Sequence, residues 1–306
     1  MKISIIFSTY NGEYTLNRLL DSLKVLTPPP CEWNVIAVDN NSSDETSTIL
    51  KSYQNDIPLT ILKELRPGKN AALNLAIKNL DDLGEFVIFT DDDVVFAIDF
   101  LQEYHGLFTS NRKHHIFGGT IQPLWEQGCP QKILDQIPIT VAFALTNERH
   151  YKQGVIDPCS ILGPNMAIQK SILESGVVFN DQVGPNSKNY VMGSETEFLN
   201  RLKGMGYTAY FEPKIKVQHI VRPWQLSKKW LKQRAFNAGR ALINEQIRNE
   251  ENINHINLFG VPRWSISKYL KLTILSLIRQ DKYKSLWDIN FLRGYMHQYK
   301  RHNHSE

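Results

Sequence analysis

Residues 86–94 read FVIFTDDDV, a short run of mostly apolar residues that ends in three consecutive aspartates. Its length and its Val, Ile and Phe content are typical of a buried β-strand. Three adjacent carboxylates at the end of such a strand repel one another, so that each disfavours the ionised form of its neighbour. The run therefore predicts a buried strand whose end carries either a cation site or a solvated turn.

The residues before this strand alternate between strand-like and helix-like patterns. Strands are expected at Ile3–Ser8, Asn34–Val38, Leu59–Leu62 and Phe86–Thr90, and helices at Tyr14–Leu26, Asp44–Tyr53 and Asn70–Leu80. Ser42 stands three residues before Glu45, which predicts a capping box at the second helix. Alternation of this kind predicts an α/β fold with a mainly parallel sheet and helices on both faces.

After residue 115 the pattern becomes mixed, and it then becomes helical. Short strands are expected at Ile116–Ile121, Ile161–Ile168, Tyr207–Phe211 and Ile215–Gln218, with a helix at Glu195–Lys203. Beyond Pro223, helical spacing predicts a helix through Leu231 and Leu242, and further helices near Ser267–Arg279 and Leu286–Lys300. We therefore expect an α/β domain over residues 1–220 and a basic, Trp-containing helical region over residues 221–306.

The composition is that of a globular protein, with 306 residues of which 42% are hydrophobic. The net charge of +4 hides an uneven distribution along the chain. Residues 1–213 carry 17 Lys and Arg against 25 Asp and Glu, a charge of −8, whereas residues 214–306 carry 18 against 6, a charge of +12. Such asymmetry indicates an anionic partner for the C-terminal region.

Cysteine usage and hydropathy indicate the compartment. Cys31, Cys129 and Cys159 are widely spaced and form no CxxC motif, so reduced cytosolic thiols are expected. The first apolar run is too short for a signal peptide, and no apolar stretch approaches the roughly 18 residues of a spanning helix. We expect a cytoplasmic protein that is either fully soluble or peripheral on the inner face of the membrane.

Polar residues follow three of the expected strands, where parallel sheets bind their ligands. They are STYNG at 8–12, Asp39 after the second strand, and Asp91 to Asp93 after the fourth. The first segment lacks the G-x-G-x-x-G of a dinucleotide site, and Gly68-Lys69 lacks the rest of a P-loop. Aspartate oxygens suit Mg²⁺ or Mn²⁺, whose shell phosphate oxygens can complete.

The order of these motifs resembles glycosyltransferase family 2, whose members are nucleotide-sugar-dependent enzymes of the GT-A fold. The resemblance is carried by TYNG, IAVDNNSSDET, GKNAALN and FTDDDV, and it continues with LGPNMAIQKSILESG, GSETEFLNRLKGMGY and FEPKIKVQH. It covers roughly residues 2–220. The motifs are specific only as a set, because an acidic triplet alone recurs by chance.

The resemblance implies roles for individual residues. It assigns to the nucleotide-sugar pocket Thr9, Asn11, Asp39, Arg66, Lys69, Asp91 and Asp92. It assigns to the metal Asp91, Asp93 and His219, the metal being Mg²⁺ or Mn²⁺. It assigns to the sugar or acceptor Trp125 and Asn165. Taken alone, His219 is better explained as a hydrogen-bonded core or surface histidine.

The resemblance also implies a catalytic base at the start of the helix near residue 195. The sequence there is GSETE, in which Glu195 occupies the place of an Asp in inverting relatives. A Glu in this place can take a proton from an acceptor hydroxyl. Glu197 is the rival base, and both carboxylates are alternatively explained as residues that favour a helix N-terminus.

The expected function is inverting transfer of a sugar from a nucleotide-diphosphate sugar, with UDP as the expected nucleotide, to a hydroxyl of a glycan or lipid-linked acceptor. Such an activity would serve cell-surface polysaccharide or glycolipid synthesis. One alternative is a non-catalytic protein that binds a nucleotide sugar or a lipid. Another is a sugar-1-phosphate nucleotidyltransferase, which would need a Gly-rich loop that STYNGEYT lacks.

The basic tail leaves two interpretations open. Residues 222–240, RPWQLSKKWLKQRAFNAGR, interleave cations with Trp224, Trp230 and Phe236, which suits an anionic membrane surface. The alternative is a helical subdomain that packs its tryptophans inward and solvates its basic face. No nucleic-acid-binding module is recognisable, so no nucleic acid partner is expected.

Overall fold

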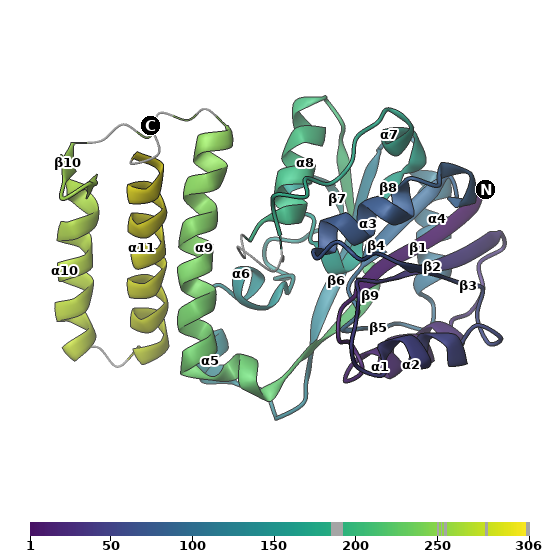
Figure 1. The fold of residues 1–306 in the computed structure, drawn as a ribbon, viewed down its shortest axis with the longest axis horizontal. Helices are drawn as coiled ribbons and strands as arrows, with labels where there is room; N and C mark the ends of the chain where they lie inside the picture. The colour runs from purple at the N-terminus through teal and green to yellow at the C-terminus, as the bar shows by residue number, and fades with distance from the viewer. Residues whose placement is uncertain (185–191, 250, 252, 254–255, 279–280, 304–306) are drawn as a thin grey trace. The chain divides into compact units, whose positions relative to one another are not determined.

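The computed structural model describes residues 1–184, 192–249, 251, 253, 256–278 and 281–303 (Figure 1). The described residues form two compact units. The first holds residues 1–124, 144–184 and 194–220. The second holds residues 125–143, 192–193 and the described residues from Val221 onward. Residues 125–143, which the sequence places in the first region, thus lie in the second unit.

The N-terminal half of the sheet is parallel. Its strands run in the order β3 (Leu59–Lys63), β2 (Glu32–Asp39), β1 (Lys2–Thr9) and β4 (Phe86–Thr90). Helices α1 (Leu16–Lys24), α2 (Thr46–Ser52) and α3 (Lys69–Ile77) connect them (Figure 1). The register pairs Thr9 with Asp39 across β1 and β2, and Phe7 with Thr90 across β1 and β4. The carboxyl ends of these strands therefore meet at one edge.

The other half of the sheet is antiparallel. After β4 it continues with β8 (Met166–Gln169), β6 (Ile116–Trp125), β9 (Ala209–Val221) and β5 (Val94–Phe96), while β7 (Gly154–Ile156) also pairs with β9. Helices α4 (Phe100–Ser110), α7 (Lys170–Glu174) and α8 (Ser194–Gly204) belong to this half. Short 3₁₀ turns are η1 (Leu80–Asp82), η2 (Pro158–Ser160) and η3 (Gly163–Asn165).

Apolar side chains cover both faces of the sheet. On one face, Ile6, Ile36 and Phe89 pack with residues of α3, α7 and α8 in a single buried cluster. On the other face, Phe86 of β4 stacks on Phe108 of α4, with ring centroids 3.9 Å apart. Alternation of side chains along each strand explains why the strands are apolar throughout, since both faces are buried.

The second unit is mainly helical. It contains α5 (Gln131–Leu134), α6 (Ile139–Phe143), η4 (Pro223–Leu226), the hairpin of β10 (Asn257–Leu258) and β11 (Val261–Pro262), and three longer helices, α9 (Lys228–Arg248), α10 (Arg263–Ile278) and α11 (Lys282–Asn303). Figure 1 shows α11 lying between α9 and α10. None of the described helices has the length and apolar content to span a bilayer.

Glycines let α9 and α11 approach closely. A Cβ on Gly239 would lie 1.9 Å from the carbonyl oxygen of Phe291, and one on Gly294 would lie 1.9 Å from that of Phe236. These distances are shorter than any van der Waals contact, so the two backbones touch only because neither position carries a side chain.

The predicted α/β fold class and the C-terminal helices are confirmed, and β4 has the predicted bounds. Two details are corrected. The strands predicted at 207–211 and 215–218 form one strand, β9, in which Glu212 accepts the N–H of Lys214. The predicted capping box is absent, because the Ser42 hydroxyl accepts a hydrogen bond from the N–H of Asn11 and α2 begins only at Thr46.

Candidate active site

Lys69 links two acidic segments of the first unit. Its Nζ lies 2.5 Å from Asp91 Oδ1, in the turn after β4, and 2.6 Å from Glu195 Oε1, on the first turn of α8. The three side chains are all shielded from solvent, with 19 to 25% of each exposed. Residues 126 positions apart in the sequence are thus joined by one ammonium group.

The charges of this cluster depend on one another. Burial alone lowers the pKa of the Lys69 ammonium, but the attraction of Asp91 and Glu195 outweighs it, so the pKa is raised. Burial raises the pKa of Asp91, and the Lys69 ammonium opposes that shift. Lys69 therefore stays charged at neutral pH, and it holds two carboxylates close together that would otherwise repel each other.

The second aspartate of the triplet contacts the loop after β1. Thr9 Oγ1 donates to Asp92 Oδ2 at 2.6 Å, and Thr9 is buried. Gly12 packs against this pair, because a Cβ there would lie 2.2 Å from Thr9 Oγ1 and 2.8 Å from Asp92 Oδ2. The glycine in TYNG is thus required by close packing against the strand-end residues.

The third aspartate contacts His219. Strand β5 pairs with β9 so that Val94 lies opposite His219, and this register brings Nε2 of His219 to 3.1 Å from Asp93 Oδ1. Both side chains are largely buried, with 10% of His219 and 19% of Asp93 exposed. A carboxylate oxygen and an imidazole nitrogen at this separation fit a divalent cation such as Mn²⁺.

The predicted metal set of Asp91, Asp93 and His219 stays a prediction. Among the residues that the structure describes, no group of three or more metal-binding side chains occurs. The reason is that Asp91 faces the Lys69 ammonium, whereas Asp93 faces His219. Protein ligands to a cation here would be Asp93 and His219, with substrate oxygens and water completing the shell.

The loops after β1 and β2 are tied together beside Asp39. This carboxylate is buried and accepts the N–H of Ser42 at 2.9 Å. Asn11, in the left-handed region at φ 49°, accepts the N–H of Ser43 through its side chain. The structure therefore places Thr9, Asn11 and Asp39 together at the carboxyl edge of β1 and β2, as the strand order predicts.

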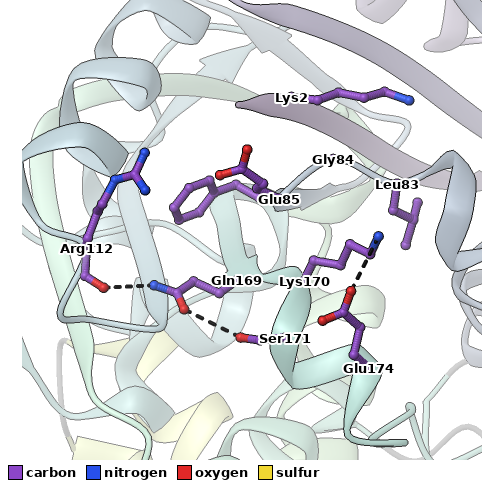
Figure 2. Close-up of a pocket in the computed structure, with 10 residues that line it drawn as sticks. Lys2, Leu83, Gly84, Glu85, Arg112, Gln169, Lys170, Ser171 and Glu174 are labelled. Carbon is purple, nitrogen blue, oxygen red and sulfur yellow. Dashed lines mark hydrogen bonds and ion pairs between the residues drawn. The ribbon is translucent and has the colours of Figure 1, made fainter.

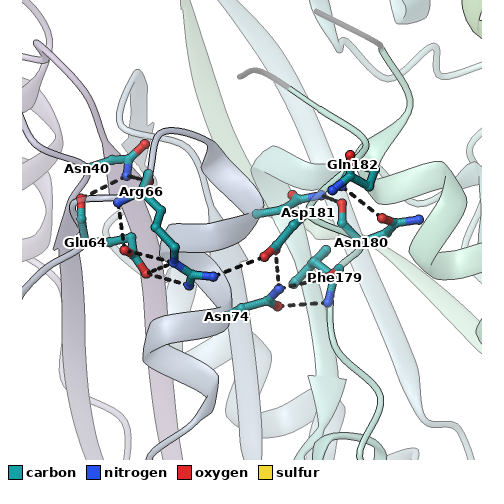
Figure 3. A network of polar contacts seen from close by, with 9 residues as sticks. Asn40, Glu64, Arg66, Asn74, Phe179, Asn180, Asp181 and Gln182 are labelled. Carbon is teal, nitrogen blue, oxygen red and sulfur yellow. Dashed lines mark hydrogen bonds and ion pairs between the residues drawn. The ribbon is translucent and has the colours of Figure 1, made fainter. Parts of the chain in front are cut away.

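Arg66 lies in a polar network that Figure 3 shows in detail. Its guanidinium contacts both carboxylate oxygens of Glu64, the nearer at 2.7 Å, and lies 3.5 Å from Asp181. Asn74 of α3 donates to Asp181 and to the carbonyl of Phe179. Arg66 is thus a link between the segment after β3 and residues 179–181, and its predicted place beside the base or diphosphate stays a prediction.

Asn165 and Trp125 are the two residues predicted to contact the sugar or acceptor. Asn165 is buried, where its Oδ1 accepts the hydroxyl of Tyr104 at 2.7 Å and its amide donates to two backbone carbonyls. The fold engages both polar atoms of this side chain, and its predicted contact with sugar or acceptor stays a prediction. Trp125 belongs to the second unit, where it packs edge to face on Phe143, and its acceptor role is untested.

The two candidate bases make different contacts in the structure. Glu197 is buried and forms two hydrogen bonds with the Arg201 guanidinium one turn further along α8, at 2.9 and 3.2 Å. Glu195 instead contacts Lys69, the first residue of α3, whose ammonium also contacts Asp91 after β4. Glu197 is thus engaged within its own helix, and Glu195 is the carboxylate of α8 that reaches the acidic cluster.

Several positioning residues carry no role in the sequence prediction. Gly163 lies against Glu195, since a Cβ there would be 2.8 Å from both Cγ and Oε1 of that side chain. Asn70 accepts the Ser194 hydroxyl and donates to the carbonyls of Asn180 and Val183. These contacts fix the start of α8. In the sequence, only the motifs GPNMA and GKNAALN indicate these two residues. Their contacts can be seen only in the folded structure.

A cavity of about 510 Å³ lies at the opposite edge of the sheet (Figure 2). Its wall includes Lys2, at the amino end of β1, together with Arg112, Lys170 and Glu174. Lys170 pairs with Glu174 at 3.4 Å, and none of the predicted site residues lines the cavity. Cations and carboxylates are mixed along this wall, so we assign no ligand to it.

Comparison with known proteins defines the class. The chain belongs to glycosyl transferase family 2, because the sequence profile of that family matches residues 4–169, more than half of its length. A poly(ribitol-phosphate) beta-N-acetylglucosaminyltransferase, TarS, from Staphylococcus aureus is 28% identical over 174 residues, which cover 54% of this chain and 30% of TarS. The chain thus spans less than a third of that relative.

Solved structures show the same fold at lower identity. The S. aureus TarS 1–349 structure in complex with UDP-GlcNAc matches with a TM-score of 0.56 at 16% identity, covering 100% of this chain and 93% of that one. The mannosyltransferase PcManGT from Pyrobaculum calidifontis in complex with GDP-Man and Mn²⁺ matches with a TM-score of 0.60 at 17% identity, covering 96% and 85%. The fold is therefore that of the GT-A glycosyltransferases.

Proposed function

We propose that the protein is an inverting glycosyltransferase that moves a sugar from a nucleotide-diphosphate sugar to an acceptor hydroxyl. The observation that carries this proposal is the Lys69 cluster, which joins Asp91 at the end of β4 to Glu195 on α8. Family membership supports the reaction class. We assign catalysis to residues 1–220 and surface attachment to residues 221–306.

Glu195 is the proposed base. A hydroxyl is a weak nucleophile until a carboxylate removes its proton as the bond to the anomeric carbon forms, an effect typically worth about 10²–10⁴ in rate. The proton passes from the acceptor oxygen to Oε of Glu195, and the nucleoside diphosphate leaves with the electron pair of the broken bond. Attack from the face opposite the diphosphate inverts the anomeric centre.

Lys69 is the proposed positioning residue for this base. Because its ammonium contacts Glu195 and Asp91 at once, it favours the ionised carboxylate that proton removal requires. Asp39 and Thr9, at the ends of β2 and β1, would contact the nucleoside, and Arg66 would lie beside the diphosphate.

Asp93 and His219 would hold Mg²⁺ or Mn²⁺. A bound cation would stabilise the charge that develops on the departing diphosphate. Support comes from the chemistry of the two side chains, and from the Mn²⁺ in the complex of the P. calidifontis mannosyltransferase.

For the donor we propose a UDP-sugar, and for the acceptor a glycan or lipid-linked chain of the cell surface. The complex of TarS with UDP-GlcNAc supports the donor class, and the name of TarS specifies a phosphate-containing polymer as its acceptor. Such a reaction would take place in the cytoplasm or at the inner face of the membrane.

A donor panel tests the proposal. Nucleotide sugars are added with and without Mn²⁺, while thermal melting reports binding and nucleoside-diphosphate release reports turnover. A ligand that binds only the native state raises the melting temperature by mass action. We expect a metal-dependent shift and slow hydrolysis with one donor. Binding without turnover for every donor and acceptor would favour a non-catalytic binding protein, and pyrophosphate release from a nucleoside triphosphate would favour a nucleotidyltransferase.

A further inference from the structure

Helix α10 exposes an apolar face. Leu270, Ile274, Leu277 and Ile278 are 56, 64, 82 and 77% exposed. Their spacing of four, three and one places them on one side of the helix. The other side is occupied, since Tyr269 and Leu272 pack against a buried cluster from α9 and α11. The exposed face thus remains after the helix has made its contacts within the second unit.

All charged residues of α10 are basic. Between Glu251 and Asp281 the sequence contains no Asp or Glu, while α10 itself carries Arg263, Lys268 and Lys271. All three basic side chains are exposed. Lys268 Nζ lies 5.9 Å from the centre of the Trp264 ring, so a cation and an indole share the N-terminal part of the helix.

The hairpin that precedes α10 adds a second exposed apolar element. β10 and β11 pair across a two-residue turn of Phe259 and Gly260, whose φ angles are 55° and 77°. A non-glycine residue is rare in this conformation, which costs roughly 1 kcal/mol or more. The Phe259 side chain is 81% exposed in this strained position, so its packing within the unit does not offset the strain.

We propose that α10 and the β10–β11 turn dock onto an anionic lipid surface, with Leu270, Ile274, Leu277 and Phe259 entering the apolar layer. A helix with exposed Leu and Ile, a Trp near one end and Lys beside the apolar stripe has the properties of an interfacial helix. Lys268, Lys271 and Arg263 would contact lipid headgroups, each adding about 1 kcal/mol. This inference is independent of the proposed reaction.

On the segment 222–240 that the sequence indicates, Trp224 is 53% exposed, but α10 exposes more large apolar side chains. Within the segment 222–240, Trp230 stacks on Phe143, with ring centroids 5.6 Å apart and planes 3° apart, and α9 packs along α11. Trp287 of α11 is buried. A second copy of the chain is a weaker occupant of the α10 face, because a symmetric contact would bring the lysines of both copies together.

Vesicle flotation tests this docking. The purified full chain is mixed with vesicles of phosphatidylcholine alone, or with about one third phosphatidylglycerol, whose headgroup is anionic. We expect the chain to float with the anionic vesicles only and to dissociate as salt is raised. Equal flotation with both vesicles, or none with either, overturns the proposal.

Paired variants locate the surface. I274S/L277S should reduce flotation at least about tenfold because two apolar anchors are lost, and K268Q/K271Q should reduce it roughly fivefold per lysine. The matched controls are I98S/V155S, whose side chains are 63 and 72% exposed, and K51Q/K113Q, both exposed and both in the first unit. Circular dichroism and thermal melting confirm that each variant is folded.

Two outcomes of the variant series contradict the proposal. One is flotation that I274S/L277S leaves at the wild-type level, or that the controls weaken equally. The other comes from sedimentation without vesicles: a wild-type chain that self-associates, becomes monomeric in I274S/L277S and binds no vesicle would assign the α10 face to a second copy.

Discussion

At the scale of single residues, the Lys69 ammonium is what lets Asp91 and Glu195 lie close together. Its contact with Glu195 spans two segments that are distant in the sequence. The motif GKNAALN points to Lys69, but only the fold shows which two carboxylates it contacts.

Lys69→Gln should move the acidic limb of the kcat/KM profile to higher pH. Without the ammonium, Asp91 and Glu195 face each other as like charges, so the ionised base forms only at higher pH. The profile is measured for wild type and for Lys170→Gln, a control whose lysine pairs with Glu174 on the surface. An unchanged acidic limb in Lys69→Gln, with activity retained, would remove Lys69 from the role of positioning the base.

Gly163→Ala should lower kcat by about a hundredfold with little loss of stability, because the new methyl group displaces the Glu195 carboxylate. The displaced group is the end of a flexible side chain, so the backbone need not move. The control is Gly204→Ala on α8, the helix that carries Glu195, because a Cβ at Gly204 meets nothing within 4 Å. Steady-state rates and melting temperatures of both variants decide between displacement and general damage.

The stabilising contribution of Glu64 should be lost in acid. The hydrogen bond from Arg66 is the main cause that lowers the pKa of Glu64 in the folded chain. Its contribution is therefore complete above the unfolded pKa of about 4.3 and is lost as pH falls through the lower folded value. Urea unfolding of wild type and Glu64→Gln should give different stabilities near neutral pH, and the two should converge as pH falls below the lowered pKa of Glu64. A difference that persists in acid would show that the pair contributes through packing and not through charge.

At the scale of helices and strands, the N-terminal βαβ units could be predicted from local pattern because each strand is apolar throughout and ends in polar residues. The bounds of β4 were predicted correctly. The sequence prediction misses β5 and α4. It also divides β9 at Pro213, where the Thr120 hydroxyl donates a hydrogen bond to the proline carbonyl and helps to hold the strand. Such partners are distant in the sequence, so a local pattern cannot reveal them.

The site residues divide in the same way. Thr9, Asp39 and the three aspartates could be predicted because each directly follows or ends a strand. The burial of Asn165 could not be predicted, since it depends on Tyr104 and on backbone groups of two strands. Gly163, Asn70 and Asn74 position the site through contacts more than 30 residues away, and no spacing in the sequence records them.

The crossing of α9 and α11 makes a prediction at this scale. Gly239→Ala should destabilise the second unit by about 1–3 kcal/mol through overpacking, although alanine favours helices. Gly106→Ala in α4 is the matched control, because a Cβ there meets nothing within 4 Å. Its stability should rise by up to about 1 kcal/mol. Thermal melting that shows stabilisation in both variants would mean that the two helices separate at little cost.

At the scale of the whole molecule, the uneven charge follows the division of chemical roles. The acidic residues 1–213 include the strand-end aspartates and Glu195, which gather around Lys69 and His219. Most of the Lys and Arg residues between positions 214 and 306 lie on α9, α10 and α11. Composition predicts the asymmetry, but only the exposed apolar side chains of α10 show which helix carries a candidate surface.

The central claim is that Glu195 removes the proton of the acceptor hydroxyl. The most direct test compares sugar transfer by Glu195→Gln and Glu197→Gln, using the donor and metal that the panel identifies and single-turnover conditions in which chemistry limits the rate. We predict that Glu195→Gln lowers the transfer rate by about 10²–10⁴ while donor affinity changes little. Glu197→Gln should transfer at close to the wild-type rate, because its carboxylate bonds only Arg201 within α8. Transfer by Glu195→Gln at the wild-type rate, or a loss confined to Glu197→Gln, would contradict this assignment.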